Sequence, residues 1–250
     1  MGHDRRGIRS KFAATVAAMV MLLMAIGAHA GLTTGSETVE GDRASGVFGW
    51  HFKYKRSFDG KKMEKDVQID FDFTDSGIKA EDQKAYRDKV RAGIQKVWNN
   101  KYVIRSGDLV IPLGVDVTYD GPFDQKVKVN AGSGRSDMTN WFTDDTGSVN
   151  AHEFGHMLGL FDEYTGGATD PANPIIDDKA LMGLGALTDN PAMPARYYQQ
   201  FLDYIRSLNR DTQFELKAVP EPASLLVWGV LLGVCLGVRS VRLRMVRREP

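Results

Sequence analysis

The spacing of apolar residues changes along the chain, and this limits the folds that the sequence can adopt. Apolar and polar residues alternate over 47–56 and 67–73, which is the period of half-buried strands. Over 80–99 the period is that of an amphipathic helix, and alternation returns over 109–119 and 126–130. This order predicts one α+β domain, a twisted mixed sheet backed by helices.

Two segments are expected to be helices that pack through one apolar face. In 80–99 this face consists of Tyr86, Val90, Ile94, Val97 and Trp98. In 194–209 it consists of Tyr198, Phe201, Leu202, Ile205 and Leu208. Glycine-rich residues 130–137 fit neither nucleotide-binding fingerprint and are interpreted as a turn. Residues 31–45 have few large apolar side chains and are interpreted as a flexible lead-in, so the folded domain is expected over 46–218.

Residues 1–30 have the layout of an export signal. Basic residues at the start precede an apolar run over 12–26, and "AHA" at 28–30 has the small-x-small pattern of a cleavage site. This order predicts a secretory signal peptide that is removed from the mature protein. A buried N-terminal helix is the alternative interpretation.

Residues 219–250 have three parts: "VPEP", an apolar stretch over 223–238, and an arginine-rich tail. As a helix the stretch would extend roughly 24 Å, so it spans a bilayer core of about 30 Å only marginally. The arginines would stay cytoplasmic and leave the preceding residues outside the inner membrane. The layout resembles the PEP-CTERM sorting signal of Gram-negative bacteria, which implies recognition by an exosortase-type membrane protease. A plain single-pass anchor is the alternative.

Charge and cysteine content narrow the classes of function. The chain has 32 basic and 32 acidic residues, and nine of the basic and two of the acidic ones lie within 1–30 and 223–250. The remainder therefore has 23 basic and 30 acidic residues and no basic stripe, so no nucleic-acid partner is expected. The one cysteine, Cys235, lies in the apolar stretch, so the exported part has no disulfide and depends on a packed core, with bound metal as a further aid.

The stretch "AHEFGHMLGLFDEY", residues 151–164, has the spacing of a metal site. His152 and His156 are four residues apart, so on a helix they lie about 40° apart around the axis and roughly 6 Å apart along it, close enough to bind one cation. Glu153 is offset by about 100°, where its carboxylate can reach a water on the metal rather than the metal itself. The spacing predicts a zinc ion with Glu153 as general base. Two surface histidines on an ordinary helix are the alternative.

A catalytic zinc ion takes three protein ligands, so a third one is required. The other histidine of the exported part, His51, is far upstream in an expected strand. Gly159 can end the helix with left-handed backbone and turn the chain back. This brings Asp162 and Glu163 toward the histidines, and either acid can be the third ligand.

The same stretch resembles the metzincin metalloproteases, whose extended motif is HExxHxxGxx followed by His or, in some members, Asp. His152, Glu153, His156, Gly159 and Asp162 occupy these positions. The resemblance implies a metzincin-like catalytic domain with an active-site helix and a C-terminal helix. It also favours Asp162 over Glu163 as the third ligand, in place of the commoner histidine.

The resemblance carries three further expectations. Met182 would lie beneath the imidazoles as the methionine turn and would not bind the metal. Tyr197 or Tyr198 would stabilise the transition state, unless both pack the final helix. An exposed strand edge within 124–130 would align an extended peptide by strand addition.

Together these features predict an exported endopeptidase with one catalytic Zn²⁺ and Glu153 as the base that activates water. The expected partners are a protein or peptide substrate, the exosortase-type enzyme and, through 223–238 until processing, the membrane. The expected location is the cell surface, the extracellular matrix, or an anchored position facing the periplasm. The alternative is a non-catalytic surface or matrix protein that holds a structural metal. Acid-rich 162–178 could also hold Ca²⁺, although it lacks the spacing of a calcium loop.

Overall fold

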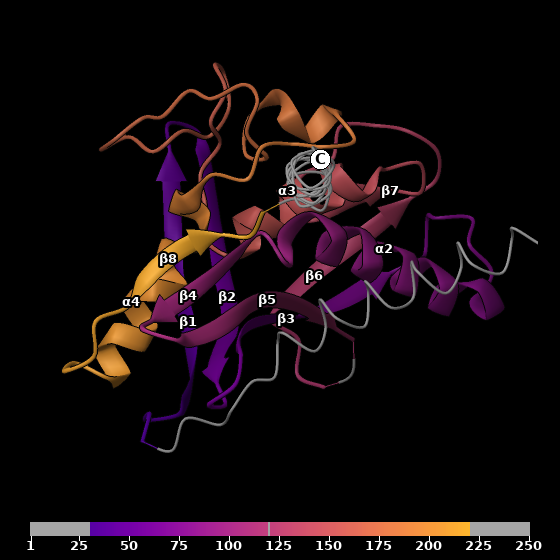
Figure 1. Ribbon diagram of the computed structural model, residues 1–250. Helices are drawn as coiled ribbons and strands as arrows, with labels where there is room; N and C mark the ends of the chain where they lie inside the picture. The colour runs from indigo at the N-terminus through magenta and orange to yellow at the C-terminus, as the bar shows by residue number, and fades with distance from the viewer. Residues whose placement is uncertain (1–30, 120, 221–250) are drawn as a thin grey trace, which may run out of the picture.

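The computed structural model describes residues 31–119 and 121–220 (Figure 1). The interpretation of 1–30 as a signal peptide lies outside these residues, as does almost all of the sorting signal expected over 219–250. Within the described part, no helix has the length and apolar character needed to cross a membrane.

Eight strands of the described residues form one mixed sheet. They are β1 (Gly35–Ser45), β2 (Phe48–Phe58), β3 (Met63–Asp72), β4 (Tyr102–Ser106), β5 (Leu109–Thr118), β6 (Gln125–Asn130), β7 (Asn140–Phe142) and β8 (Glu215–Ala218). The main order is β1-β2-β3-β5-β4-β8, in which β3 and β5 are parallel and the other neighbours antiparallel. Beyond this path β6 is parallel to both β3 and β7.

The interpretation of residues 31–45 as a flexible lead-in is wrong for most of that segment. Gly35–Ser45 is β1, and it pairs with β2 along its whole length (Figure 1). A shortage of large side chains did not prevent this, because pairing satisfies the backbone N–H and C=O groups whatever the side chains are. At Gly41 a Cβ would lie 3.0 Å from the Phe52 ring, so the small residue accommodates the aromatic side chain of β2.

Three α-helices are described: α2 (Gln83–Trp98), α3 (Gly147–Met157) and α4 (Gln199–Leu208). Short 3-10 helices are η1 (Ala80–Asp82), η2 (Leu184–Leu187) and η3 (Ala195–Tyr198). All five residues of the expected inward face of α2 are buried. In the final helical segment the first turn is η3, and Tyr204 is buried whereas Leu208 is half-buried. The α+β class is confirmed, with helices beside a mixed sheet.

Close contact with α2 fixes the position of α3. The two helices meet at glycines, since a Cβ on Gly93 would lie 2.8 Å from the Gly147 Cα. The fully buried Trp98 donates a hydrogen bond from its Nε1 to the Ala151 carbonyl at 3.0 Å. Helix α3 is thus held within the core at its first two turns, directly before the first histidine.

Candidate metal centre

Helix α3 has defined ends, and its C-terminal end matches the sequence interpretation. It begins after Thr146, whose hydroxyl accepts a hydrogen bond from the Val149 N–H at 3.3 Å. Beyond its last residue, Gly159 has φ +81°, the left-handed conformation that turns the chain back. The Leu160 N–H then donates to the Gly155 carbonyl at 3.1 Å, so the chain returns along the helix that it has just left.

The turn brings Asp162 to both histidines. Its Oδ1 lies 3.1 Å from Nε2 of His152 and 3.3 Å from Nε2 of His156. The three side chains are only 8, 11 and 7% exposed for His152, His156 and Asp162. One possible ligand atom from each lies within 4.8 Å of the others, so the three metal-ligating residues expected from the sequence form one buried group.

Hydrogen bonds determine which atoms of His152, His156 and Asp162 face the space between the three side chains. Nδ1 of His152 lies 2.7 Å from the Leu181 carbonyl, and Nδ1 of His156 lies 2.9 Å from the Leu160 carbonyl. Because a carbonyl only accepts, each Nδ1 carries a proton, and in the neutral form of the ring this tautomer leaves the Nε2 lone pair for the space between the three side chains. Asp162 Oδ2 accepts a hydrogen bond from the backbone N–H of Ala168 at 2.6 Å.

The remaining oxygen, Asp162 Oδ1, is buried without a hydrogen-bond donor. Two lone pairs and one carboxylate oxygen that face one another are suited to bind a cation between them. In a tetrahedral zinc site with bonds of about 2.0–2.1 Å, ligand atoms are about 3.3 Å apart, close to the two separations observed. The two nitrogen donors and one oxygen donor therefore fit zinc.

Burial and charge act on the carboxylates in opposite directions. Burial raises the pKa of the Asp162 carboxyl, but His152 and His156 beside it lower the pKa more, and the net shift is well below the usual range. Burial raises the pKa of Glu153 to about 7; His152 opposes this shift and Asp162 adds to it. Asp162 is thus held as an anion, whereas Glu153 exchanges a proton near neutral pH.

Glu153 and the three possible ligands line one cavity of about 430 Å³. One wall is residues 48–50 of β2, beside the β1–β2 turn. The other wall is residues 135–139, which precede β7. Trp50 connects the first wall to the histidines, because its Nε1 donates to the His156 carbonyl at 3.1 Å and its ring lies edge-on to the imidazole.

Glu163, the rival third ligand, does not approach the histidines. Its carboxylate accepts two hydrogen bonds from the Arg196 guanidinium and one, at 2.6 Å, from the Tyr197 hydroxyl. Its backbone N–H donates to the Met182 carbonyl at 2.7 Å. Glu163 instead ties the turn after α3 to later parts of the chain, and Asp162 is the acid that the fold brings to the histidines.

Met182 lies against α3, as the methionine turn would. It is fully buried, and a Cβ on Gly155 would lie 2.4 Å from its Sδ. The methionine sulfur therefore lies beside the glycine that precedes His156. The preceding Leu181 carbonyl fixes the His152 ring, so this turn supports the histidines through both a side chain and a backbone group.

Neither expected tyrosine offers its hydroxyl to the cavity. Tyr197 donates to Glu163 and accepts from the Met182 N–H at 3.0 Å. Tyr198 donates to the Trp98 carbonyl at 2.6 Å. Both pack the final helical segment. The sequence interpretation missed Tyr164, which lines the cavity with its ring centroid 6.3 Å from that of His152. Its position two residues after Asp162 is the sequence feature that could have indicated its place beside the site.

The expected free strand edge within 124–130 is paired with other strands in part, and its role in aligning a peptide stays a prediction. Strand β6 pairs with β3 over 125–128 and with β7 over 128–130. The three residues of β7 were too few to reveal this strand by their pattern. The acids of 162–178 also form no second cluster: in the part of the chain that the structure describes, the one group of at least three suitable metal-binding side chains is His152, His156 and Asp162.

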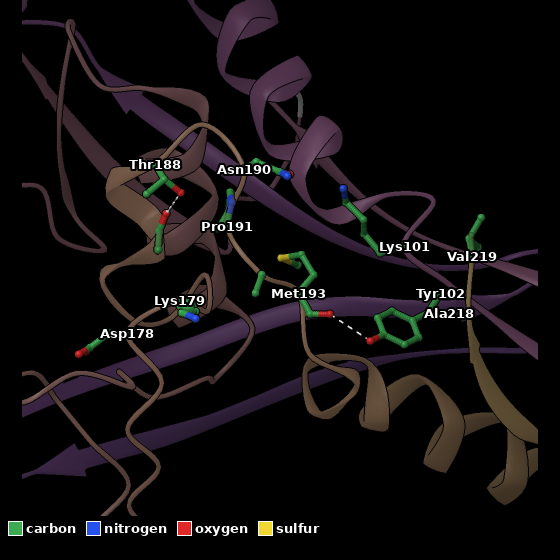
Figure 2. Close-up of a pocket in the computed structure, with 12 residues that line it drawn as sticks. Lys101, Tyr102, Asp178, Lys179, Thr188, Asn190, Pro191, Met193, Ala218 and Val219 are labelled. Atoms are coloured by element: carbon green, nitrogen blue, oxygen red, sulfur yellow. Dashed lines mark hydrogen bonds between the residues drawn. The ribbon is translucent and has the colours of Figure 1, made fainter. Parts of the chain in front are cut away.

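A second cavity, about 650 Å³ in volume, has a different lining (Figure 2). Lys101 and Tyr102 lie on one side with Ala218 and Val219, and the Tyr102 hydroxyl donates to the Met193 carbonyl at 3.1 Å. Its lining contains no histidine, glutamate, serine or cysteine. Its ionisable groups are Asp178, two lysines and Tyr102, so despite its larger volume this cavity has no counterpart of the two histidines and the glutamate that line the smaller one.

No protein-family model, curated protein or solved structure matches the chain. Its function must therefore be inferred from the chemistry of the groups described above.

Proposed function

We propose that the protein is a zinc-dependent endopeptidase of the metzincin type. The observation that carries the proposal is the approach of Asp162 Oδ1 to both Nε2 atoms, with Glu153 lining the same cavity. A structural zinc site is closed by four protein ligands, whereas this group has three and borders a cavity. A glutamate directly after the first histidine has a use in hydrolysis and none in a structural site.

The residues have distinct roles in the proposed reaction. His152, His156 and Asp162 hold the ion, and zinc, when bound, polarises a carbonyl and lowers the pKa of water. Glu153 takes a proton from the attacking water as the water oxygen bonds to the peptide carbonyl carbon. It then gives this proton to the leaving nitrogen as the C–N bond breaks. One water and one peptide bond thus become a carboxylic acid and an amine, without a covalent enzyme intermediate.

The proposed place of action is outside the inner membrane. This part of the proposal rests on the layouts of 1–30 and 219–250, with removal of the C-terminal helix and tail by an exosortase-type enzyme. The metal group itself needs no disulfide, because its ligands are held by backbone hydrogen bonds and core packing.

The test compares zinc content and cleavage of an unfolded protein for wild type, Glu153→Gln, Asp162→Ala and Asp178→Ala. Wild type is expected to bind one zinc and cleave. Glu153→Gln should retain zinc and lose cleavage by about 10²–10⁴-fold, the usual contribution of a general acid–base group. Asp162→Ala should lose zinc.

Asp178→Ala is the matched control, because Asp178 is an exposed acid outside the metal group, and it should match wild type. Wild-type activity in Glu153→Gln would remove the role given to Glu153. A wild type that binds zinc and cleaves no peptide would instead favour a structural metal in a surface or matrix protein.

A further inference from the structure

Arg135 is the one lysine or arginine among the described residues that line the metal-centre cavity, and the mechanism above gives it no role. It lies in the glycine-rich segment 130–137, on the wall before β7. The opposite wall, formed by Phe48, Gly49 and Trp50, is uncharged. Arg135 is exposed, and it forms no salt bridge with any acid in the described part of the chain. Its charge is therefore available to a molecule that enters the cavity.

The three acids that line the same cavity have other partners or another role. Asp162 faces the two histidines, and Glu153 is the proposed base. The Asp137 carboxylate accepts hydrogen bonds from the backbone N–H groups of Thr139 and Asn140, at 2.7 and 2.9 Å, and from both of their side chains. The carboxylate that best complements the guanidinium would thus come from a bound molecule.

Contacts on both sides of Arg135 hold its backbone in place. A Cβ on Gly134 would lie 2.1 Å from the Phe142 ring, so this glycine packs directly against β7. Ser136 donates a hydrogen bond from its Oγ to the Asp145 carboxylate at 2.7 Å, just before the start of α3. Since α3 carries both histidines and the proposed base, these contacts fix the backbone of Arg135 relative to the metal group.

The charges of the proposed site favour an acidic ligand at Arg135. One zinc ion with Asp162 and an ionised Glu153 would have no net charge, so the guanidinium would leave the cavity positive. Such a cavity attracts an acidic side chain and repels a lysine or an arginine. A guanidinium also matches a carboxylate in shape, because it can donate two parallel hydrogen bonds to the two oxygens.

We propose that Arg135 determines specificity by selecting peptides with an aspartate or glutamate close to the bond that is cut. This inference rests on the proposed endopeptidase function and names its substrate class. Arg135 binds the acidic side chain of the substrate and takes no part in the transfer of the proton or the breaking of the bond. The pairing lasts from substrate binding to the transition state, so the selection is expressed in kcat/KM.

The test uses the full-length zinc-loaded protein and peptides that are acetylated at the N-terminus and amidated at the C-terminus, so that only side chains carry carboxylates. In a cleaved mixture of such peptides, aspartate and glutamate should be enriched at one position within about two residues of the cut. Paired peptides with glutamate or glutamine at that position should then differ about tenfold in kcat/KM. Added salt should reduce this difference, because the guanidinium is exposed and its charge is screened.

Two variants identify Arg135 as the source of the preference. Arg135→Gln should bring the glutamate-to-glutamine ratio of kcat/KM to about one, and Arg135→Glu should favour a peptide with lysine at the same position. Arg105→Gln, which changes an exposed arginine of β4 outside the cavity, is the matched control and should keep the wild-type ratio. Zinc content should equal that of wild type in all three variants, so that a changed ratio does not reflect loss of metal.

The proposal is overturned if the wild type shows no preference for an acidic side chain, or if Arg135→Gln keeps the wild-type ratio. In either case a cleaving wild type leaves the endopeptidase function intact. A zinc-loaded wild type that cleaves no peptide of the mixture rejects the endopeptidase function and this inference together.

Discussion

Lys65 is a buried lysine whose replacement should stabilise the protein. It lies in β3 and is 1% exposed. Its Nζ donates to the Gln200 side-chain oxygen at 2.8 Å and lies 5.1 and 4.6 Å from the ring centroids of Tyr54 and Phe201. These partners are a neutral amide and two aromatic rings, which do not neutralise the ammonium charge.

The free-energy cost of burying the Lys65 ammonium group follows from its pKa. Burial, with a smaller contribution from the charge of Arg56, lowers the pKa of Lys65 from 10.5 to about 7. At roughly 1.4 kcal/mol per pKa unit, the depressed pKa costs about 4 kcal/mol of unfolding free energy at pH 7. Attraction of the ammonium to the two rings offsets part of this cost. Lys65→Met should therefore raise the free energy of unfolding at pH 7 by about 2–4 kcal/mol.

The sign of the pH dependence is fixed. Because the pKa of Lys65 is lower in the folded state, the unfolded state binds more protons between pH 7 and 10.5, and the wild-type chain gains stability from this group as pH rises. The advantage of Lys65→Met should be full below pH 7 and shrink by up to about 1.4 kcal/mol per pH unit above it.

Urea unfolding at several pH values from 6 to 10 measures this difference. The exposed Lys61→Met is the matched control and should change stability little at any pH. Zinc content should be that of wild type in both variants, since Lys65 lies outside the metal group. A stability difference that does not vary with pH would refute the depressed pKa. A less stable Lys65→Met would show that the amide and ring contacts outweigh burial of the charge.

Three further predictions concern the metal centre. Chelation of zinc should lower the melting temperature of the wild type, because Asp162 Oδ1 is then left facing two lone pairs, and Asp162→Ala should show no such response. Free zinc at about 1,000 times its Kd would add about 4 kcal/mol to the free energy of unfolding. Gly155→Ala should lower the free energy of unfolding by about 1–3 kcal/mol, measured by thermal unfolding, because the new Cβ would meet the Met182 sulfur. A second substitution that shortens the Met182 side chain should restore part of this loss. Glu163→Gln should lower stability by about 3 kcal/mol in urea, because the Arg196 guanidinium loses a buried carboxylate; a loss below about 0.5 kcal/mol would contradict this role.

Local patterns predicted the parts of the fold that depend on one segment alone. The inward face of α2 was correct residue by residue, and alternation located β3 and β5 because each buries every second side chain. Strand β1 was missed because pairing with β2 stabilises it, and its own residues carry little apolar signal. Strand β7 was missed for a related reason, since three residues show no period.

The residues of the candidate site also divide into those that one segment predicts and those that depend on distant segments. His152, Glu153 and His156 could be predicted because they lie within little more than one helical turn. The choice between Asp162 and Glu163 could not be made from spacing alone, since it depends on Arg196 and Tyr197 more than 30 residues later.

In the proposed site, Asp162 and an ionised Glu153 would carry two negative charges in a buried group, which one zinc ion would balance. An aspartate in place of a third neutral imidazole would also cancel part of the positive charge of the ion and so weaken its pull on a substrate carbonyl. The departure from the commoner histidine ligand therefore changes the charge of the proposed site as well as the identity of one ligand.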